Sequence, residues 1–447
     1  MNIEISIKNV QHINNLNVCI ELEKLNIICI VSKNGAGKTT LIKALRNLQY
    51  ADTFAKTSSR FIFNDKSEIK IKIFGDEYIY KYNSKLSLID TKQIIKDNVK
   101  DGLFTELPIP FGDRFNHFQT LSNSDNLLRE ALARNNYTSP YELISFLQEI
   151  YENQNYNNLK VTKIAKKDIY FILKDDGYYI REDYLSSGEF FVLSLYKMIN
   201  GDKKLIIIDE IDISLDSSAQ VKLVRFLTEL CQKNEKKIIF TTHSLALIKT
   251  LDVNSILYLE NTNGTTTISN KSYNYIKSTM FGFKGYDKYI LTEDIELRDY
   301  LEYIISKMDD VFYNYKIIYI GGSDNTIDLM LRNDKEHIFS TTENVITVLD
   351  GDQSDKLKKE WSHDKYKEIR KSIFTIPFES IEKDIYKLYM ESPSEFPLLT
   401  KYNGAKIVYK GLRYHMSKQQ IYKIIEDKCP NEVFEFSTLI EKFLSKH

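Results

Sequence analysis

A glycine-containing loop between an apolar run and a helical pattern constrains the fold of this chain most strongly. Five consecutive apolar residues, Ile27–Val31, lead into Ser32–Gly37, and a helical pattern begins near Lys38. A strand, a loop with glycines and a helix in this order form a phosphate-binding loop, in which backbone N–H groups surround phosphate oxygens. The sequence therefore predicts an α/β fold that binds a nucleoside triphosphate where this helix begins.

The residue types of the loop match the chemistry of a bound triphosphate. We expect the Lys38 ammonium to reach the β- and γ-phosphates and the Thr39 hydroxyl to ligate Mg²⁺. One departure is visible, because Ser32 occupies the position of the usual first glycine. The predicted ATP-binding residues of the loop are Asn34, Gly35, Gly37, Lys38, Thr39 and Thr40.

Polar motifs follow at three later points in the first 260 residues. They are the segment Leu185–Glu189, the acidic pair Asp209–Glu210 after the aliphatic run 205–208, and His243 after an apolar run at 238–242. An acidic pair at the end of an aliphatic strand is costly to place unless a ligand uses it. An Asp that ligates a cation beside a Glu that orients water is the pairing that phosphoryl transfer requires.

The segment Leu185-Ser186-Ser187-Gly188-Glu189 resembles the ABC ATPase signature, and the resemblance covers roughly residues 1–260. It implies that Asp209 supports the metal, that Glu210 polarises the attacking water and that His243 contacts the γ-phosphate. Gln119 is a candidate for the glutamine that links the metal to this phosphate.

The same resemblance implies at least a homodimer, and it allows a higher oligomer. Ser186 and Gly188 of one chain would contact ATP held by Lys38 of the partner subunit. Asp216 would belong to the loop that crosses the dimer interface.

A second α/β pattern begins near residue 280. Strands are predicted at 289–291, 316–320 and 345–349, and helices at 295–307 and 324–332. We therefore predict an ATPase domain over residues 1–280 and a second domain with C-terminal helices over 281–447. A helical insert is expected at about 120–160, where Ser139-Pro140-Tyr141-Glu142 has the spacing of a capping box.

Acidic residues follow three predicted strands of the second domain. They are Glu293 and Asp294, Asp350 and Asp352, and Glu379 and Glu382. Carboxylates at the carboxyl ends of parallel strands can converge on a hard cation, and oxygen ligands of this kind select Mg²⁺ or Mn²⁺. Two such cations would clamp the attacking and leaving oxygens of a phosphodiester. A tight turn is the alternative explanation for Asp350-Gly351-Asp352.

This pattern resembles the TOPRIM domain, a Rossmann-like fold, over roughly residues 285–400. The resemblance implies that Glu293 is the first ligand or general base and that Asp350 and Asp352 form the metal pair. Glu382 is the expected further ligand, with Glu379 as the competing choice.

Two features near this pattern leave alternatives open. Asp294 stands where many TOPRIM domains have glycine, so its role and that of Glu296 are undecided. A lysine on the predicted helix 406–413 could stabilise transition-state charge, and Lys406 is preferred over Lys410. The basic run from 356 to 371 is either a solvated face or a track for a phosphate backbone.

An ABC-type ATPase followed by a TOPRIM domain resembles the OLD family, the overcoming-lysogenization-defect nucleases. The resemblance implies an ATP-regulated, metal-dependent endonuclease that acts on nucleic acid, with DNA expected first, in antiphage defence. Some relatives are retron effectors, which would make a reverse transcriptase with its msDNA the partner. The alternative is an SMC- or RecF-like DNA-maintenance ATPase whose TOPRIM module binds without catalysis.

Composition excludes several other classes. A formal net charge of −1 excludes a uniformly basic nucleic-acid coat. The four cysteines are scattered without a CxxC pair, which disfavours a zinc or disulfide framework and suits the cytoplasm. No apolar run approaches the roughly 20 residues that span a membrane, so no membrane partner is expected.

Overall fold

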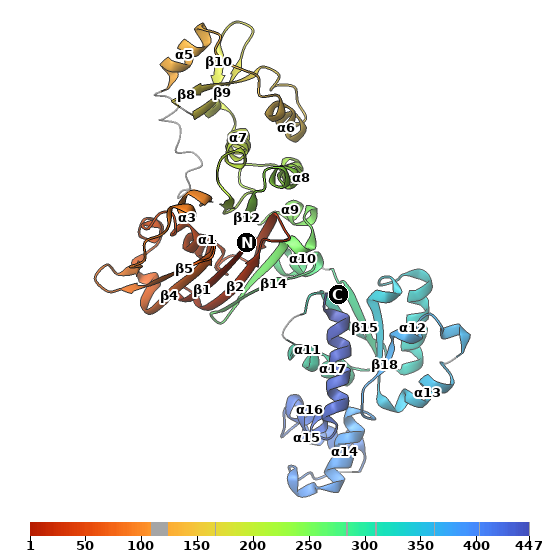
Figure 1. Cartoon of the computed structure of the whole chain (residues 1–447). Helices are drawn as coiled ribbons and strands as arrows, with labels where there is room; N and C mark the ends of the chain where they lie inside the picture. Colours follow the sequence, from red (N-terminus) through yellow and green to blue (C-terminus); the bar gives the residue numbers. More distant parts are fainter. Residues whose placement is uncertain are drawn as a thin grey trace. The chain divides into compact units, whose positions relative to one another are not determined.

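The computed structural model describes residues 1–108, 124–165, 167–282, 285–308, 311–361, 363–401 and 403–446. The chain divides into two compact units, Met1–Asn270 and Lys271–His447, which Figure 1 colours from red to green and from green to blue. The division falls before the predicted boundary at residue 280. The reason is that Ser272, which caps α10 (Tyr273–Phe281), bonds to Asp287 and Phe312 of the second unit.

The first unit is built on one large mixed sheet. In the described residues it has eleven strands in the order β6-β5-β4-β1-β2-β14-β13-β3-β12-β11-β7. Its strands are β1 (Asn2–Val10), β2 (Ile13–Glu21), β3 (Ile27–Val31), β4 (Phe63–Ile73), β5 (Asp76–Asn83), β6 (Leu88–Asp90), β7 (Leu103–Glu106), β11 (Leu205–Ile208), β12 (Lys237–Thr241), β13 (Ile256–Thr262) and β14 (Thr265–Asn270).

The parallel part of this sheet carries the predicted motifs. Strands β3 and β11 are fully buried and flank β12, with Ile239 aligned between Ile28 and Ile207. Continuous apolar strands of this kind form the centre of a parallel sheet covered on both faces. The antiparallel strands β1, β2, β4 and β5 alternate between buried and exposed residues. They belong to the same sheet because β14 pairs with both β13 and β2.

Helices and a small antiparallel sheet, β10-β9-β8, complete the first unit (Figure 1). The predicted helical insert therefore continues into strands. Its capping box is wrong: α6 has Pro140 as N-cap without a side-chain hydrogen bond, and the Ser139 hydroxyl instead accepts from Lys160 Nζ at 2.7 Å. The elements are α1 (Lys38–Arg46), α2 (Thr53–Thr57), α3 (Asp97–Gly102), α5 (Asp125–Ala133), α6 (Tyr141–Tyr151), β8 (Leu159–Ile164), β9 (Lys167–Leu173), β10 (Tyr179–Arg181), α7 (Ser187–Asn200), α8 (Ser217–Lys233) and α9 (Leu245–Thr250).

The second unit is a parallel α/β sheet with four strands in the order β16-β15-β17-β18 within the described residues. Strand β15 pairs with β16 on one side and with β17 on the other. In the second pairing Thr292 aligns with Val348. The elements are β15 (Lys288–Thr292), α11 (Ile295–Ser306), β16 (Tyr315–Tyr319), α12 (Ser323–Glu336), β17 (Val345–Leu349), α13 (Ser354–Lys359), β18 (Ile373–Thr375), α14 (Ile381–Glu391), α15 (Ala405–Leu412), α16 (Lys418–Glu426) and α17 (Pro430–Leu444).

Two apolar clusters cover the two faces of this sheet. One joins α11 and the C-terminal helices, and the other joins α12 with the residues around Trp361. Because β15 and β17 are neighbouring parallel strands, their carboxyl ends meet at one edge of the sheet, where ligands of open α/β sheets bind. No helix in the ranges given above is both long and apolar enough to cross a membrane.

Candidate nucleotide and carboxylate sites

The loop after β3 is organised around Lys38, whose side chain is buried. Lys38 Nζ donates to Ser32 O at 3.1 Å and to Ser32 Oγ at 2.9 Å. Gly35 and Gly37 have φ values of 79° and 115°, which L side chains rarely adopt. Ser32, the departure from the usual glycine, thus supplies a hydroxyl that holds the lysine at the start of α1.

The two predicted metal ligands of this site lie together. The buried Asp209 carboxylate accepts from Thr241 Oγ1 at 2.5 Å and is hydrogen-bonded to Thr39. Burial raises the pKa of Asp209, and the hydrogen bonds from Thr241 and Thr39 and the charge of Lys38 oppose this shift. The hydroxyl and carboxylate donors suit Mg²⁺, which prefers oxygen ligands and is held by such a pair in phosphate-loop enzymes.

The backbone after Asp209 places Glu210 in an uncommon conformation. Its φ is 54°, in the left-handed region, and its N–H donates to Thr241 Oγ1 at 2.8 Å. A non-glycine residue in this region costs free energy that the surrounding structure must supply, and such residues cluster at functional sites. The hydrogen bond from the Glu210 N–H to Thr241 ties the loop after β11 to the end of β12 and holds this backbone conformation.

His243 lies at the end of β12, within electrostatic reach of Lys38. Burial lowers the pKa of His243, the charge of Lys38 lowers it further, and Asp212 and Asp209 oppose the shift. The imidazole is therefore neutral at pH 7, able to donate one hydrogen bond to a phosphate oxygen.

Sequence reasoning missed Thr241 and Asp212 as members of this site. Thr241 holds Asp209 and Glu210, and Asp212 accepts from Thr242 Oγ1 at 2.6 Å. The one available signal for Asp212 was its place two residues after Glu210. Gln119, the candidate link between metal and γ-phosphate, lies outside the described residues.

The signature segment is a helix start packed on the loop before α8. Ser186 and Glu189 form a capping box at α7, and an added Cβ at Gly188 would lie 2.6 Å from Ser214 O. Asp216 caps α8 by accepting from the N–H groups of Ser218 and Ala219 at 2.9 and 3.0 Å. The hydrogen bonds of Ser186 in the described residues are those of this capping box, to Glu189, and the predicted contact of Ser186 with ATP of a second subunit stays a prediction.

We expect Gly188→Ala to destabilise the first unit by about 1–3 kcal/mol, because the clash is with a backbone carbonyl that cannot rotate away. ATP hydrolysis should fall as the signature segment shifts. Gly102→Ala, where an added Cβ would meet its nearest atom at 3.6 Å, should leave both unchanged. Chemical unfolding and phosphate release measure the two effects, and equal stability of the two variants would contradict the packing argument.

In the second unit, four predicted carboxylates gather at the carboxyl edge of the sheet. Glu293 Oε1 accepts from the Asp350 N–H at 2.9 Å. Burial and, after it, the charges of Glu293, Asp294, Asp352 and Glu382 together raise the pKa of Asp350 to about 8. The predicted ligands therefore lie within electrostatic reach of one another.

The segment Asp350-Gly351-Asp352 is not a turn that needs positive φ. The φ of Gly351 is not positive, so its backbone conformation does not require glycine. The space around it does, because an added Cβ would lie 2.0 Å from Phe378 O. The glycine is needed because the loop after β17 approaches the loop after β18. This contact brings the Asp352 N–H to Glu379 O at 3.2 Å.

The neighbours of the two alternative glutamates differ. The exposed Glu379 pairs with Lys387 at 2.7 Å. Burial raises the pKa of Glu382. The charges of Asp294 and Glu296 add to this rise, and the charge of Lys406 opposes it. The influence of Asp294 indicates that Glu382 lies beside the cluster. Asp294 caps α11 by accepting from the Leu297 N–H at 2.9 Å.

The donor set of this cluster suits a hard divalent cation, since half-buried carboxylates that repel one another are stabilised by a positive charge between them. Lys383 partly provides that charge, with its Nζ 2.5 Å from Asp352 Oδ2. Among the described residues, no group of three or more His, Cys, Asp or Glu side chains is already placed to hold a metal ion. The cluster has the chemistry of a metal site, and its side chains would have to reorient to bind.

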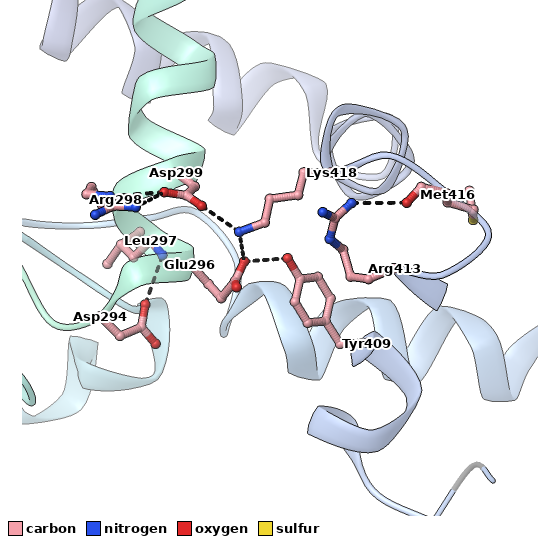
Figure 2. Close-up of polar contacts among 9 residues, drawn as sticks. All are labelled: Asp294, Glu296, Leu297, Arg298, Asp299, Tyr409, Arg413, Met416 and Lys418. Atoms are coloured by element: carbon pink, nitrogen blue, oxygen red, sulfur yellow. Dashed lines mark hydrogen bonds and ion pairs between the residues drawn. The ribbon is translucent and has the colours of Figure 1, made fainter. Parts of the chain in front are cut away.

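A polar network links α11 to the C-terminal helices beside this cluster (Figure 2). Lys418 Nζ bonds to Glu296 Oε2 at 2.7 Å and to Asp299 Oδ2 at 2.5 Å, and the Tyr409 hydroxyl donates to the same Glu296 oxygen. Burial raises the pKa of Asp299, but hydrogen bonds from Lys418 and Arg298 outweigh it and leave the pKa lowered. The network fixes the start of α16 against the first turns of α11.

Lys418→Met should lower the free energy of unfolding at pH 7 by about 1–2 kcal/mol, less than for a fully buried pair because 24% of the lysine side chain is exposed. A carboxylate whose pKa is depressed by folding stabilises the protein above its unfolded-state pKa. The difference between wild type and variant should therefore shrink as the pH falls below the ordinary Asp value of 3.8. Urea titrations across this range measure it, and a pH-independent difference would exclude the ionic contribution.

Comparison with known proteins bears on the first unit. Residues 27–249 match the family model described as "AAA domain, putative AbiEii toxin, Type IV TA system". The phosphonates import ATP-binding protein PhnC of Fusobacterium nucleatum is 24% identical over 250 residues, which are 55% of this chain and 82% of that protein.

Solved structures give weaker similarities. The SMC head domain from Thermotoga maritima is 13% identical with a TM-score of 0.35, over 60% of this chain and 98% of that one. The Smc head domain with a coiled coil and joint derived from Pyrococcus yayanosii is 10% identical with a TM-score of 0.41, over 62% and 99%.

Proposed function

We propose that this chain, whose residues 27–249 form a P-loop ATPase domain of the ABC type, is an ATP-regulated, metal-dependent nucleic-acid endonuclease. The observation that supports the nuclease activity is the gathering of Glu293, Asp350, Asp352 and Glu382 at the carboxyl edge of the second sheet. The arrangement suits the TOPRIM resemblance. DNA is the first substrate to test.

In this proposal Asp350, Asp352 and Glu382 would hold Mg²⁺ or Mn²⁺, and the bound cation would supply positive charge to neutralise the scissile phosphate. Glu293 accepts the proton of the attacking water as the water oxygen bonds to phosphorus and one P–O ester bond breaks. Lys406 stabilises the charge that develops on the phosphoryl oxygens, and the leaving oxygen takes up a proton. Lys383 leaves Asp352 when the site is loaded.

The first unit regulates this reaction through a homodimer. Ser186 and Gly188 of one chain contact ATP bound by Lys38 and Thr39 of the partner subunit, and Asp216 lies in the loop at that interface. Closing of the dimer on ATP permits cleavage by the second unit, and hydrolysis promoted by Glu210 resets the complex. The OLD resemblance further suggests a role in antiphage defence, with a reverse transcriptase and its msDNA as the partner to seek in a pull-down from the native host.

The experiment is a cleavage assay on supercoiled plasmid, single-stranded DNA and RNA, with Mg²⁺ or Mn²⁺ and with ATP, ADP or no nucleotide. The proposal expects cleavage that requires the metal and changes with the nucleotide. No cleavage of any substrate under any of these conditions would contradict it.

A second candidate function is a DNA-maintenance ATPase of SMC or RecF type with a non-catalytic second unit. One observation favours it: Asp352 is paired with Lys383, and no three metal-ligating side chains among the described residues are preassembled. Calorimetric titration with Mn²⁺ separates the two. Binding that is lost in Asp350→Asn supports the nuclease, and no binding to the wild type supports the alternative.

A further inference from the structure

The C-terminal helices of the second unit carry an unusual distribution of charge. From Phe396 to Ile425 the chain has no Asp or Glu and has six Lys or Arg residues, although the whole chain carries a net charge of −1. Arg413 donates to Met416 O, and Lys418 is paired with Glu296 and Asp299 (Figure 2). In the part of the chain that the structure describes, Lys401, Lys406 and Lys410 are exposed and have no ion-pair partner.

Two of these cations, Lys406 and Lys410, share a face of α15 with apolar side chains. Lys406, Ile407, Lys410 and Tyr414 are exposed and recur at i, i+1, i+4 and i+8, the spacing of one helical face. Tyr414 continues the helical path, since its N–H donates to Gly411 O at 3.2 Å, and its side chain is 80% exposed. The opposite face, Val408, Tyr409 and Leu412, is buried.

We propose that this basic-aromatic face, defined by Lys406, Ile407, Lys410 and Tyr414, binds single-stranded nucleic acid. Lysines neutralise the phosphates, and an exposed tyrosine offers a ring on which an unpaired base stacks, the combination found in single-strand binding surfaces. A duplex would leave the tyrosine without a base to stack on, because its bases are paired and stacked on one another.

The basic-aromatic face begins beside the carboxylate cluster. Lys406 lies close enough to oppose the raised pKa of Glu382. Tyr409 and Lys418 hold α15 and α16 on α11, which starts directly after Glu293 and Asp294. A strand bound along α15 would therefore be led toward the proposed cleavage site. The biological purpose of this face rests on the proposed nuclease function. The binding experiment that tests the face does not depend on that function.

The test is fluorescence anisotropy of a labelled oligothymidylate with the full chain carrying Asp350→Asn, in EDTA, so that neither metal nor cleavage is involved. Tyr414→Ala should weaken binding about 5- to 100-fold, as for loss of one stacked base. The double variant Lys406→Gln/Lys410→Gln should make the slope of log affinity against log salt shallower by about 1.4, since each phosphate contact on a single strand contributes about 0.7.

Matched controls are available in the same unit. Phe434→Ala removes another exposed ring, and the double variant Lys428→Gln/Lys442→Gln removes two exposed lysines outside the face. Both variants should bind as the parent does. A duplex of equal length should bind more weakly than the single strand and should be indifferent to Tyr414→Ala.

Three results would overturn the proposal. They are no binding of the parent chain, equal effects of the face variants and their controls, and competition by polyglutamate as strong as by oligothymidylate, which would indicate an acidic protein partner instead. Binding with the expected variant effects but without cleavage by the wild type would support this face while contradicting the nuclease.

Discussion

Asp350→Asn is expected to abolish metal-dependent strand cleavage, by about 100-fold or more, while ATP hydrolysis by the first unit continues at the wild-type rate. Charge neutralisation by a metal contributes several kcal/mol to such a reaction, and each roughly 1.4 kcal/mol is a factor of ten. Asp350 is the most perturbed carboxyl of the cluster, with a pKa raised to about 8 by burial and by its acidic neighbours. Plasmid nicking in Mn²⁺ measures the loss.

The stability of this variant separates a site residue from a structural one. Asparagine preserves the shape of the side chain and removes a carboxyl group whose burial among other acids costs free energy at pH 7, as its raised pKa shows. The unfolding free energy should therefore stay equal or rise, as is common where a site is kept for function at a cost in stability. Asp355→Asn, an exposed acid on the adjacent helix, is the matched control and should cut normally. Equal cutting by both variants would remove Asp350 from the site.

Glu210→Gln should lower the rate of ATP hydrolysis about 100- to 1000-fold, the usual contribution of a positioned proton acceptor. ATP binding should persist, because Lys38, Thr39 and Asp209 keep their contacts. The variant should accumulate as a dimer in ATP, which light scattering after gel filtration would detect. A monomer in ATP under all conditions would contradict regulation through an ATP-bound dimer.

A closely matched control exists for this variant. Glu235 is also a glutamate with positive φ, 53°. It is exposed, and it lies between α8 and β12, away from the carboxyl ends of the strands where Glu210 lies. Glu235→Gln should hydrolyse ATP normally. Lys38→Ala should lose ATP binding, and Lys33→Ala, at an exposed lysine of the same loop, should retain it. Equal activity of Glu210→Gln and Glu235→Gln would exclude Glu210 as the group that activates water.

The local features of both units could be read from consecutive residues. The phosphate loop is an example, because Gly35 and Gly37 are required by their own φ angles and the buried strand before them by its apolar run. Helices such as α11 and α15 were predictable for the same reason, since their periodicity repeats within a few residues. The signature segment was predictable as a motif. The need for glycine at position 188 was not, because it comes from the close approach of the Ser214 carbonyl.

What only the tertiary structure decided depends on residues far apart in the chain. The pairing of β14 with β2, the ion pair of Lys383 with Asp352 and the contacts of Lys418 with Glu296 and Asp299 each join segments that no local pattern relates. The sequence alone determined that this chain has a triphosphate-binding loop and acidic strand ends. Packing determined which carboxylates meet, because side-chain encounters across a sheet follow from strand order and helix docking, which the order of residues does not encode locally.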